Sequence, residues 1–147
     1  MPEPIKDRKI RIAIAGCGRI SKSHFGAVET HSDNLELAAV CEKDKDILRA
    51  HEKQYGVPGY SSLEEMLDSE KLDLVSLCTP SGMHPAETIM AARKKVHVMT
   101  EKPMATRWKD ALEMVRVCDE EDVHLLEVKQ NRRNSTLQFL KGAAIWR

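Results

Sequence analysis

Two closely spaced glycines, Gly16 and Gly18, follow a short apolar run and precede a stretch with helical character. Gly16 permits a tight turn after a strand, and Gly18 lets the backbone approach an anion with no side chain in the way. The first N–H groups of the next helix and its dipole attract the same anion. The sequence matches G-x-G-x-x-G except that Ser21 replaces the third glycine, and a small residue there still allows close helix–strand packing. We predict a pyrophosphate site at this turn.

An acidic residue, Glu42, comes directly after the next apolar run, Leu35–Cys41. Its carboxylate is placed to accept hydrogen bonds from the ribose hydroxyls of an adenosine, and its charge repels a 2′-phosphate. This pattern favours NAD over NADP as the cofactor. Lys43 acts in the opposite direction, because a cation beside the ribose helps to hold a 2′-phosphate. A charged surface turn is the alternative interpretation.

Lys102 stands between Glu101 and Pro103, immediately after the apolar run Val96–Thr100. A lysine held on so short a tether, with a carboxylate beside it, has three possible roles. It is a proton-transfer group, an anchor for an anion or a hydroxyl, or an ordinary solvated lysine. His84, at the start of a predicted helix, either hydrogen-bonds a ligand near a nicotinamide or caps the helix.

The remaining histidines and the serines give no pattern of a metal centre or of nucleophilic catalysis. No cluster of His, Cys, Asp and Glu has metal-ligand spacing, and no G-x-S-x-G is present. We therefore expect no metal site. The histidines considered are His31, His51, His97 and His124.

The four cysteines are widely spaced and form no C-x-x-C pair. We expect free thiols in a reducing cytoplasm, in keeping with an N-terminus that has no apolar segment of a secretory signal. Cys17 lies in the glycine turn, where a thiol is either reactive or simply tolerated. The other three are Cys41, Cys78 and Cys118.

Charge and hydropathy exclude several classes of partner. The 147 residues contain 23 Lys and Arg and 23 Asp and Glu, so the formal net charge is zero. This balance argues against nucleic acid or an acidic membrane surface as the general partner. No apolar run approaches the roughly 18 residues of a membrane span.

Apolar runs alternate with helical patterns along the whole chain. Such alternation predicts an α/β fold, a doubly wound and mostly parallel Rossmann sheet in three layers, with ligands outside the carboxyl ends of the strands. Apolar residues at helical spacing are expected to face inward, among them Ile20, Ile47, Trp108, Leu112 and Val115. Ser61 or Ser62 and Thr106 are expected to cap helices. The positions after the strands are residues 16–19, 42, 79–84, 101–103 and 130–132.

Three segments of the chain are predicted. Residues 1–8 are a polar lead-in with two prolines, and residues 9–134 form the NAD(P)-binding domain. Residues 135–147 begin a further helix. Arg132 and Arg133 with Lys129 form a basic patch that either meets a substrate diphosphate or is ordinary surface.

The glycine turn, Cys78–His84 (CTPSGMH) and Thr100–Pro103 (TEKP) together resemble the Gfo/Idh/MocA family of nicotinamide-dependent sugar dehydrogenases. Residues 129–134 (KQNRRN) and 104–108 (MATRW) are similar to the bacterial UDP-N-acetylglucosaminuronate 3-dehydrogenases of lipopolysaccharide O-antigen synthesis. The resemblance covers residues 10–144. It implies hydride transfer between a sugar carbon and NAD, with NADP the less favoured cofactor.

The resemblance also assigns roles to residues. Lys102 is implied as the acid/base or positioning group near the nicotinamide and the reacting hydroxyl. Asn131 and Arg132 are implied on the substrate side. The implied cofactor-binding residues are Gly16, Cys17, Gly18, Arg19, Ile20, Glu42, Thr79, Pro80, His84, Glu101, Lys102 and Gln130.

Members of this family continue into a second α/β domain that binds the sugar and forms the oligomer interface. We therefore expect a truncated chain that binds the cofactor without full catalysis, from a protein that is a homo-oligomer and acts on a nucleotide sugar. The alternative is a non-catalytic dinucleotide-binding module used for sensing or assembly.

Overall fold

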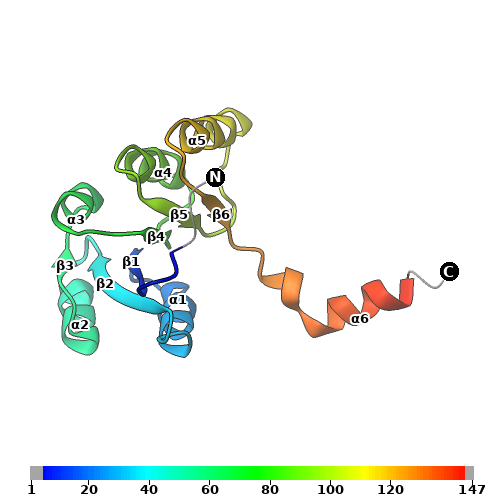
Figure 1. Ribbon diagram of the computed structural model, residues 1–147, viewed down its shortest axis with the longest axis horizontal. Helices are drawn as coiled ribbons and strands as arrows, with labels where there is room; N and C mark the ends of the chain where they lie inside the picture. The colour runs from blue at the N-terminus through cyan, green and yellow to red at the C-terminus, as the bar shows by residue number, and fades with distance from the viewer. Residues whose placement is uncertain (1–4, 145–147) are drawn as a thin grey trace.

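Six parallel strands form one sheet, in the order β3-β2-β1-β4-β5-β6, in the computed structural model, which describes residues 5–144 (Figure 1). The chain starts in the middle of the sheet, runs to one edge, then crosses back and fills the other half. The predicted doubly wound parallel sheet is therefore confirmed. The strands are β1 Ile10–Ala15, β2 Leu35–Cys41, β3 Gly59–Tyr60, β4 Leu74–Leu77, β5 His97–Thr100 and β6 Leu125–Glu127.

Helices cover both faces of the sheet. Helices α1 and α2 lie on one face, and α3, α4 and α5 lie on the other, as right-handed crossovers in two directions from β1 require (Figure 1). Helix α6 extends away from the sheet beyond β6 (Figure 1). The helices are α1 Ser21–Thr30, α2 Lys45–Tyr55, α3 Leu63–Ser69, α4 His84–Arg93, α5 Trp108–Glu120 and α6 Ser135–Ala144, with a 3-10 turn, η1, at Gln130–Arg133.

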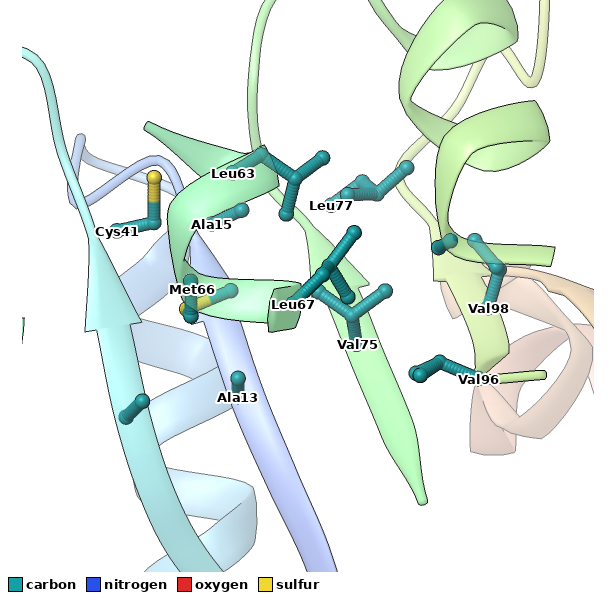
Figure 2. Packing of buried hydrophobic residues seen from close by; sticks show 12 residues of the cluster. Ala13, Ala15, Cys41, Leu63, Met66, Leu67, Val75, Leu77, Val96 and Val98 are labelled. Atoms are coloured by element: carbon teal, nitrogen blue, oxygen red, sulfur yellow. The ribbon is translucent and has the colours of Figure 1, made fainter. Parts of the chain in front are cut away.

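The core lies on both sides of the central strand. In β1, Ala13 and Ala15 belong to the cluster under α3 and α4, whereas Ile14 belongs to the cluster under α1 and α2. Strand side chains alternate between faces, so the part of β1 that is buried on both faces, Ile12–Ala15, is apolar at successive positions. Figure 2 shows Met66 and Leu67 of α3 packed over these strands. This burial fixes the strand ends, where the candidate site lies.

Helix α2 shows how local sequence sets the start and end of an element. The Asp44 side chain accepts hydrogen bonds from the backbone N–H groups of Asp46 (2.9 Å) and Ile47 (3.1 Å), which satisfies two free donors of the first turn. Gly56 ends the helix with a φ of 66°, a conformation that glycine adopts without strain. The predicted bounds of this helix are confirmed.

Some predicted inward residues point to solvent. Ile20 and Ile47 are 42% and 39% exposed. Ile20 has α-region backbone dihedrals but is the N-cap residue, one position before the first residue of α1, Ser21, which takes the buried position instead. In α2, Leu48 takes the buried position, and a shift of one residue turns Ile47 outward.

The inward face predicted for α5 is wrong at three residues and correct at Cys118, which has the same helical spacing. Trp108, Leu112 and Val115 are 77%, 51% and 44% exposed. Helix α5 lies beside α4, where Cys118 is 2% exposed and packs inward together with Val117. Both sides of this helix carry apolar residues, so spacing alone did not identify the side that meets α4.

The predicted caps form differently. Ser62 is the N-cap residue of α3, but its side chain makes no cap hydrogen bond. Arg107, not Thr106, occupies the N-cap position of α5. Residues 1–4 of the predicted lead-in and 145–147 of the predicted last segment lie outside the described residues. Among residues 5–144, none of the helices has the length and apolar character needed to cross a bilayer.

Two histidines meet where β5 and β6 begin. The His97 Nδ1 atom accepts a hydrogen bond from the His124 backbone N–H at 3.1 Å, and the ring centroids are 5.0 Å apart. Burial and the His124 ring lower the pKa of His97, while Asp73 and Asp122 act against that shift. Nδ1 accepts only while it carries no proton, so this bond at the sheet edge depends on neutral His97.

Acidification is expected to destabilise the fold through His97. A lowered pKa in the folded state means that the stabilisation is complete above the ordinary value of 6.5 and is lost as pH falls through the folded value. Urea titrations at about pH 7.5 and about pH 5.5 measure how much the free energy of unfolding falls on acidification. We expect this fall to be smaller in His97→Gln than in the wild type. The exposed His31→Gln variant is the control, and equal losses in both variants would contradict this assignment.

Candidate functional site

A cavity of about 570 Å³ opens at the carboxyl ends of β1, β2 and β4. This is the position expected for a ligand site in a doubly wound sheet, where the strand order reverses beside β1. Its wall combines apolar side chains with two carboxylates. The lining residues are Ala15, Gly16, Gly18, Cys41, Glu42, Lys43, Ser61, Leu63, Cys78, Thr79, Pro80, Met83 and Glu87.

The two glycines of the turn are required for different reasons. Gly16 has a φ of 86°, and a Cβ atom on it would lie 2.8 Å from the backbone of Cys78 and Thr79. A Cβ on Gly18 would meet nothing within 4 Å. The fold therefore demands glycine at position 16, whereas position 18 leaves open space for a ligand beside the backbone.

Ser21 fulfils the packing role of the third glycine. Its side chain is fully buried at the start of α1, and its hydroxyl donates to the Gly18 carbonyl at 2.6 Å. The hydroxyl thus finds a partner inside the turn and fixes where α1 begins. The substitution in the motif leaves close helix–strand packing intact.

Glu42 links two of the strand ends. Its carboxylate accepts hydrogen bonds from the backbone N–H groups of Cys17 (2.8 Å), Lys43 (2.7 Å) and Asp44 (3.1 Å). A carboxylate has about four acceptor positions, so it can accept a further bond from a ligand hydroxyl. The residue lies at the cavity wall, where the sequence predicted a ribose partner.

Cys17 is not a reactive thiol. It is 6% exposed, and burial, with the nearby Glu42 and neighbouring thiols, raises its pKa to about 12. The thiol is therefore protonated at neutral pH, because the thiolate is the nucleophile only after the proton leaves. All four cysteines are free, as expected.

Glu87 is a site residue that sequence reasoning missed. It lies in the first turn of α4, is 7% exposed and lines the cavity. The Thr79 hydroxyl donates to its carboxylate. Burial raises the pKa of Glu87, while the Thr79 hydrogen bond and the charges of His84 and Lys43 oppose that shift. Its position in the first turn of the helix after a strand-end loop is the feature of the sequence that could have identified it.

His84 ties two loops together. Its ring is 1% exposed, with Nε2 2.9 Å from the Thr79 carbonyl and Nδ1 3.1 Å from the Pro103 carbonyl. The capping alternative is wrong, because α4 begins without a side-chain cap hydrogen bond. With both nitrogens facing backbone carbonyls, the ring holds the loop after β4 against the loop after β5.

Glu101 orients the backbone of Lys102. One carboxylate oxygen accepts the Lys102 N–H at 3.1 Å, and the other lies 3.0 Å from His24 Nε2. The opposite ring nitrogen of His24 lies 2.8 Å from the buried Ser76 hydroxyl. Sequence reasoning missed His24, although it lies one helical turn after Ser21 on the inner side of α1.

A second hollow, of about 520 Å³, surrounds Lys102. It brings together residues from the loop after β5 and the segment after β6, as the sequence predicted. In the part of the chain that the structure describes, no carboxylate pairs with the side chains of Lys102 or Arg132, whereas Lys129 pairs with Glu127 at 2.5 Å. The lining residues are Lys102, Val128, Lys129, Gln130, Asn131 and Arg132.

The predicted site residues thus fall into three groups. Gly16, Gly18, Glu42, Thr79 and Pro80 line the first cavity, and Lys102, Gln130, Asn131 and Arg132 line the second hollow. Cys17, His84 and Glu101 are buried behind the walls. Arg19 and Ile20 are exposed at the start of α1 and line neither space.

Residues 10–129 match the family model described as "Oxidoreductase family, NAD-binding Rossmann fold". The chain is 32% identical over 137 residues to D-apiose dehydrogenase of Paraburkholderia graminis, and 32% identical over 120 residues to D-glucoside 3-dehydrogenase of Escherichia coli. These alignments cover 92% and 81% of this chain, but only 36% and 33% of the two relatives.

Two solved structures are more similar still. The WlbA dehydrogenase of Chromobacterium violaceum, in complex with NADH and UDP-GlcNAcA, is 53% identical and superimposes with a TM-score of 0.94 over 97% of this chain and 41% of its own. The WlbA dehydrogenase of Bordetella pertussis, with the same ligands, is 50% identical with a TM-score of 0.94, over 97% and 43% of the two chains.

The two glycines are expected to respond differently to alanine. Gly16→Ala places a Cβ against rigid backbone at a positive φ, so we expect the free energy of unfolding to fall by at least about 2 kcal/mol. The Cβ of Gly18→Ala meets open space, so this variant should lower the free energy of unfolding by less than about 0.5 kcal/mol. Urea denaturation followed by circular dichroism measures both, and equal losses would refute the distinction.

Proposed function

This chain belongs to the Gfo/Idh/MocA oxidoreductase family, and on that premise we propose that it binds NAD as part of a nucleotide-sugar dehydrogenase. The chain spans about two fifths of the length of the WlbA structures it matches. Cofactor binding is proposed for the residues described here, and hydride transfer for the whole protein.

The observation that carries the proposal is the joint geometry of Gly16, Gly18 and Glu42. An obligatory glycine makes the turn, a second glycine leaves its Cβ position open to a ligand, and the Glu42 carboxylate lies beside the turn, where it accepts the Cys17 N–H. The two glycines suit a pyrophosphate, and the carboxylate suits the hydroxyls of an adenosine ribose. The residues present therefore fit a dinucleotide.

Each part of the site has a proposed task. The turn and the start of α1 hold the pyrophosphate, Glu42 accepts the ribose hydroxyls, and the loop Thr79–Pro80 lines the path toward Lys102. His84 and Glu101 act from behind the walls, by fixing these loops. When bound, NAD supplies the hydride acceptor, the C4 atom of its nicotinamide.

The hollow around Lys102 is proposed as the sugar side of the site. Lys102, Lys129 and Arg132 give it a positive lining, which suits the diphosphate and carboxylate of a UDP-N-acetylglucosaminuronate. Lys102 is proposed to exchange a proton with, or to position, the C3 hydroxyl that is oxidised. The WlbA structures carry NADH with UDP-GlcNAcA, which supports this substrate.

Four free thiols fit a reducing compartment, and we include a cytoplasmic location in the proposal. The family resemblance adds a homo-oligomer. The rival interpretation, a non-catalytic dinucleotide-binding module, gives no task to the cationic hollow beside Lys102.

Calorimetric titration with NADH and with NADPH tests the cofactor. We expect wild-type protein to prefer NADH by at least about ten-fold, because the Glu42 charge opposes a 2′-phosphate. Glu42→Gln removes that charge and should narrow the preference. The exposed Glu29→Gln variant is the control. Binding of neither dinucleotide would reject the proposed function, whereas equal binding of both would reject only the role of Glu42.

Titration of the NADH-loaded chain with UDP-GlcNAcA tests the sugar side. We expect saturable binding that weakens by about ten-fold or more in Arg132→Ala, which removes one charge from the hollow. Lys109→Ala, an exposed change of the same sign on α5, should have no effect. If Arg132→Ala binds UDP-GlcNAcA as tightly as the wild type while NADH binding is retained, the sugar assignment to this hollow fails and the cofactor assignment stands.

A further inference from the structure

One acidic group of the first cavity, Glu87, has no task in the proposed site for the pyrophosphate and the ribose. It lines the cavity and is 7% exposed, and its carboxylate accepts a hydrogen bond from the Thr79 hydroxyl. A carboxylate has about four acceptor positions, so the Thr79 hydroxyl uses only part of the acceptor capacity that Glu87 presents at the cavity wall. The site is therefore suited to a ligand that brings a donor to Glu87.

The position of Glu87 relative to the other groups indicates which part of the ligand it meets. Glu87 shares the first cavity with Cys41 and Lys43, at the end of β2. Glu42 lies between those two residues in the sequence. A pyrophosphate at Gly18 and a ribose at Glu42 leave the base one glycosidic bond away, in the part of the cavity that contains Glu87.

The remaining walls of this part suit a flat heteroaromatic ring. Leu63 of α3 and Met83 beside α4 are apolar lining residues, and Ser61 adds one small hydroxyl. Apolar walls with few polar groups are typical of sites where orientation is set by one or two hydrogen bonds. Glu87 supplies the strongest acceptor in that region.

We propose that Glu87 selects adenine by accepting a hydrogen bond from its 6-amino group. The ring nitrogens of adenine that face outward are acceptors, so the amino group is the donor that a carboxylate can use. A base with an oxygen at position 6 would place an acceptor against the carboxylate instead, with its nearest donor, N1–H, displaced to the adjacent ring position. Thr79 holds Glu87 from the side of the protein, which leaves the rest of its acceptor capacity for the base.

The groups around Glu87 act in opposite directions on its charge, and burial, which raises its pKa, has the largest effect. Burial disfavours the charged form, but the Thr79 hydroxyl, His84 and Lys43 all favour it. His84 is in turn fixed by the Thr79 and Pro103 carbonyls. The same residues that tie the two loops together therefore keep an acceptor in place for the base.

The test compares NADH with reduced nicotinamide hypoxanthine dinucleotide, in which an oxygen replaces the 6-amino group. Calorimetric titration of the wild-type chain should give at least about ten-fold weaker binding of the hypoxanthine analogue. In Glu87→Gln the side-chain amide offers both a donor and an acceptor, so the two dinucleotides should bind within about three-fold of each other. Glu64→Gln, an exposed change on α3, should keep the wild-type preference.

The outcomes separate this inference from the proposed function on which it rests. Equal binding of the two dinucleotides by the wild type, or an unchanged preference in Glu87→Gln, would overturn the role of Glu87 and leave NAD binding intact. Binding of neither would overturn both. If Glu87→Gln does not fold by circular dichroism, Glu87→Ala provides the same test, since it also removes the carboxylate and should abolish the preference.

Discussion

The arrangement of the site depends on how closely β1 approaches the loop after β4. At Gly16 the chain turns where a single Cβ would collide with the backbone of Cys78 and Thr79. The backbone is tied on both sides there, because Gly16 N–H donates to the Cys41 carbonyl at 2.8 Å and Cys78 N–H donates to the Ala15 carbonyl at 2.7 Å. The ends of β1, β2 and β4 are therefore fixed relative to one another before any ligand binds.

Carboxylates beside these strand ends are used to hold backbone and loops. Glu42 joins the glycine turn to the end of β2, and Glu101 joins Lys102 to His24 of α1. Each accepts hydrogen bonds from backbone N–H groups, which are donors that the irregular loops leave free. A site built in this way needs little rearrangement to receive a ligand, which lowers the cost of binding.

The sequence predicted what depends on local pattern. The strand Leu35–Cys41 and the helix Lys45–Tyr55 have their predicted bounds, because alternation, a capping Asp and a terminal Gly are encoded locally. The exposed face of α5 and the contacts of His24 and Glu87 were not predicted, because they depend on which element packs beside each residue. Lys102 and Asn131 were placed together correctly, since both follow strands that end at the same edge.

The two spaces at the edge of the sheet differ in chemistry, and the difference follows from their positions. The first lies at the ends of β1, β2 and β4, between the glycine turn, α3 and α4, where most of its wall is apolar and the Glu87 carboxylate is buried. The second lies beyond β5, where the segment after β6 contributes Lys129 and Arg132 from exposed backbone. Lys129 pairs with Glu127, whereas the exposed Arg132 is tolerated without a carboxylate partner among residues 5–144 because water still reaches it. A zero net charge over the chain thus conceals a change along the strand ends, from two carboxylates in the wall of the first cavity to three cationic side chains around the second hollow.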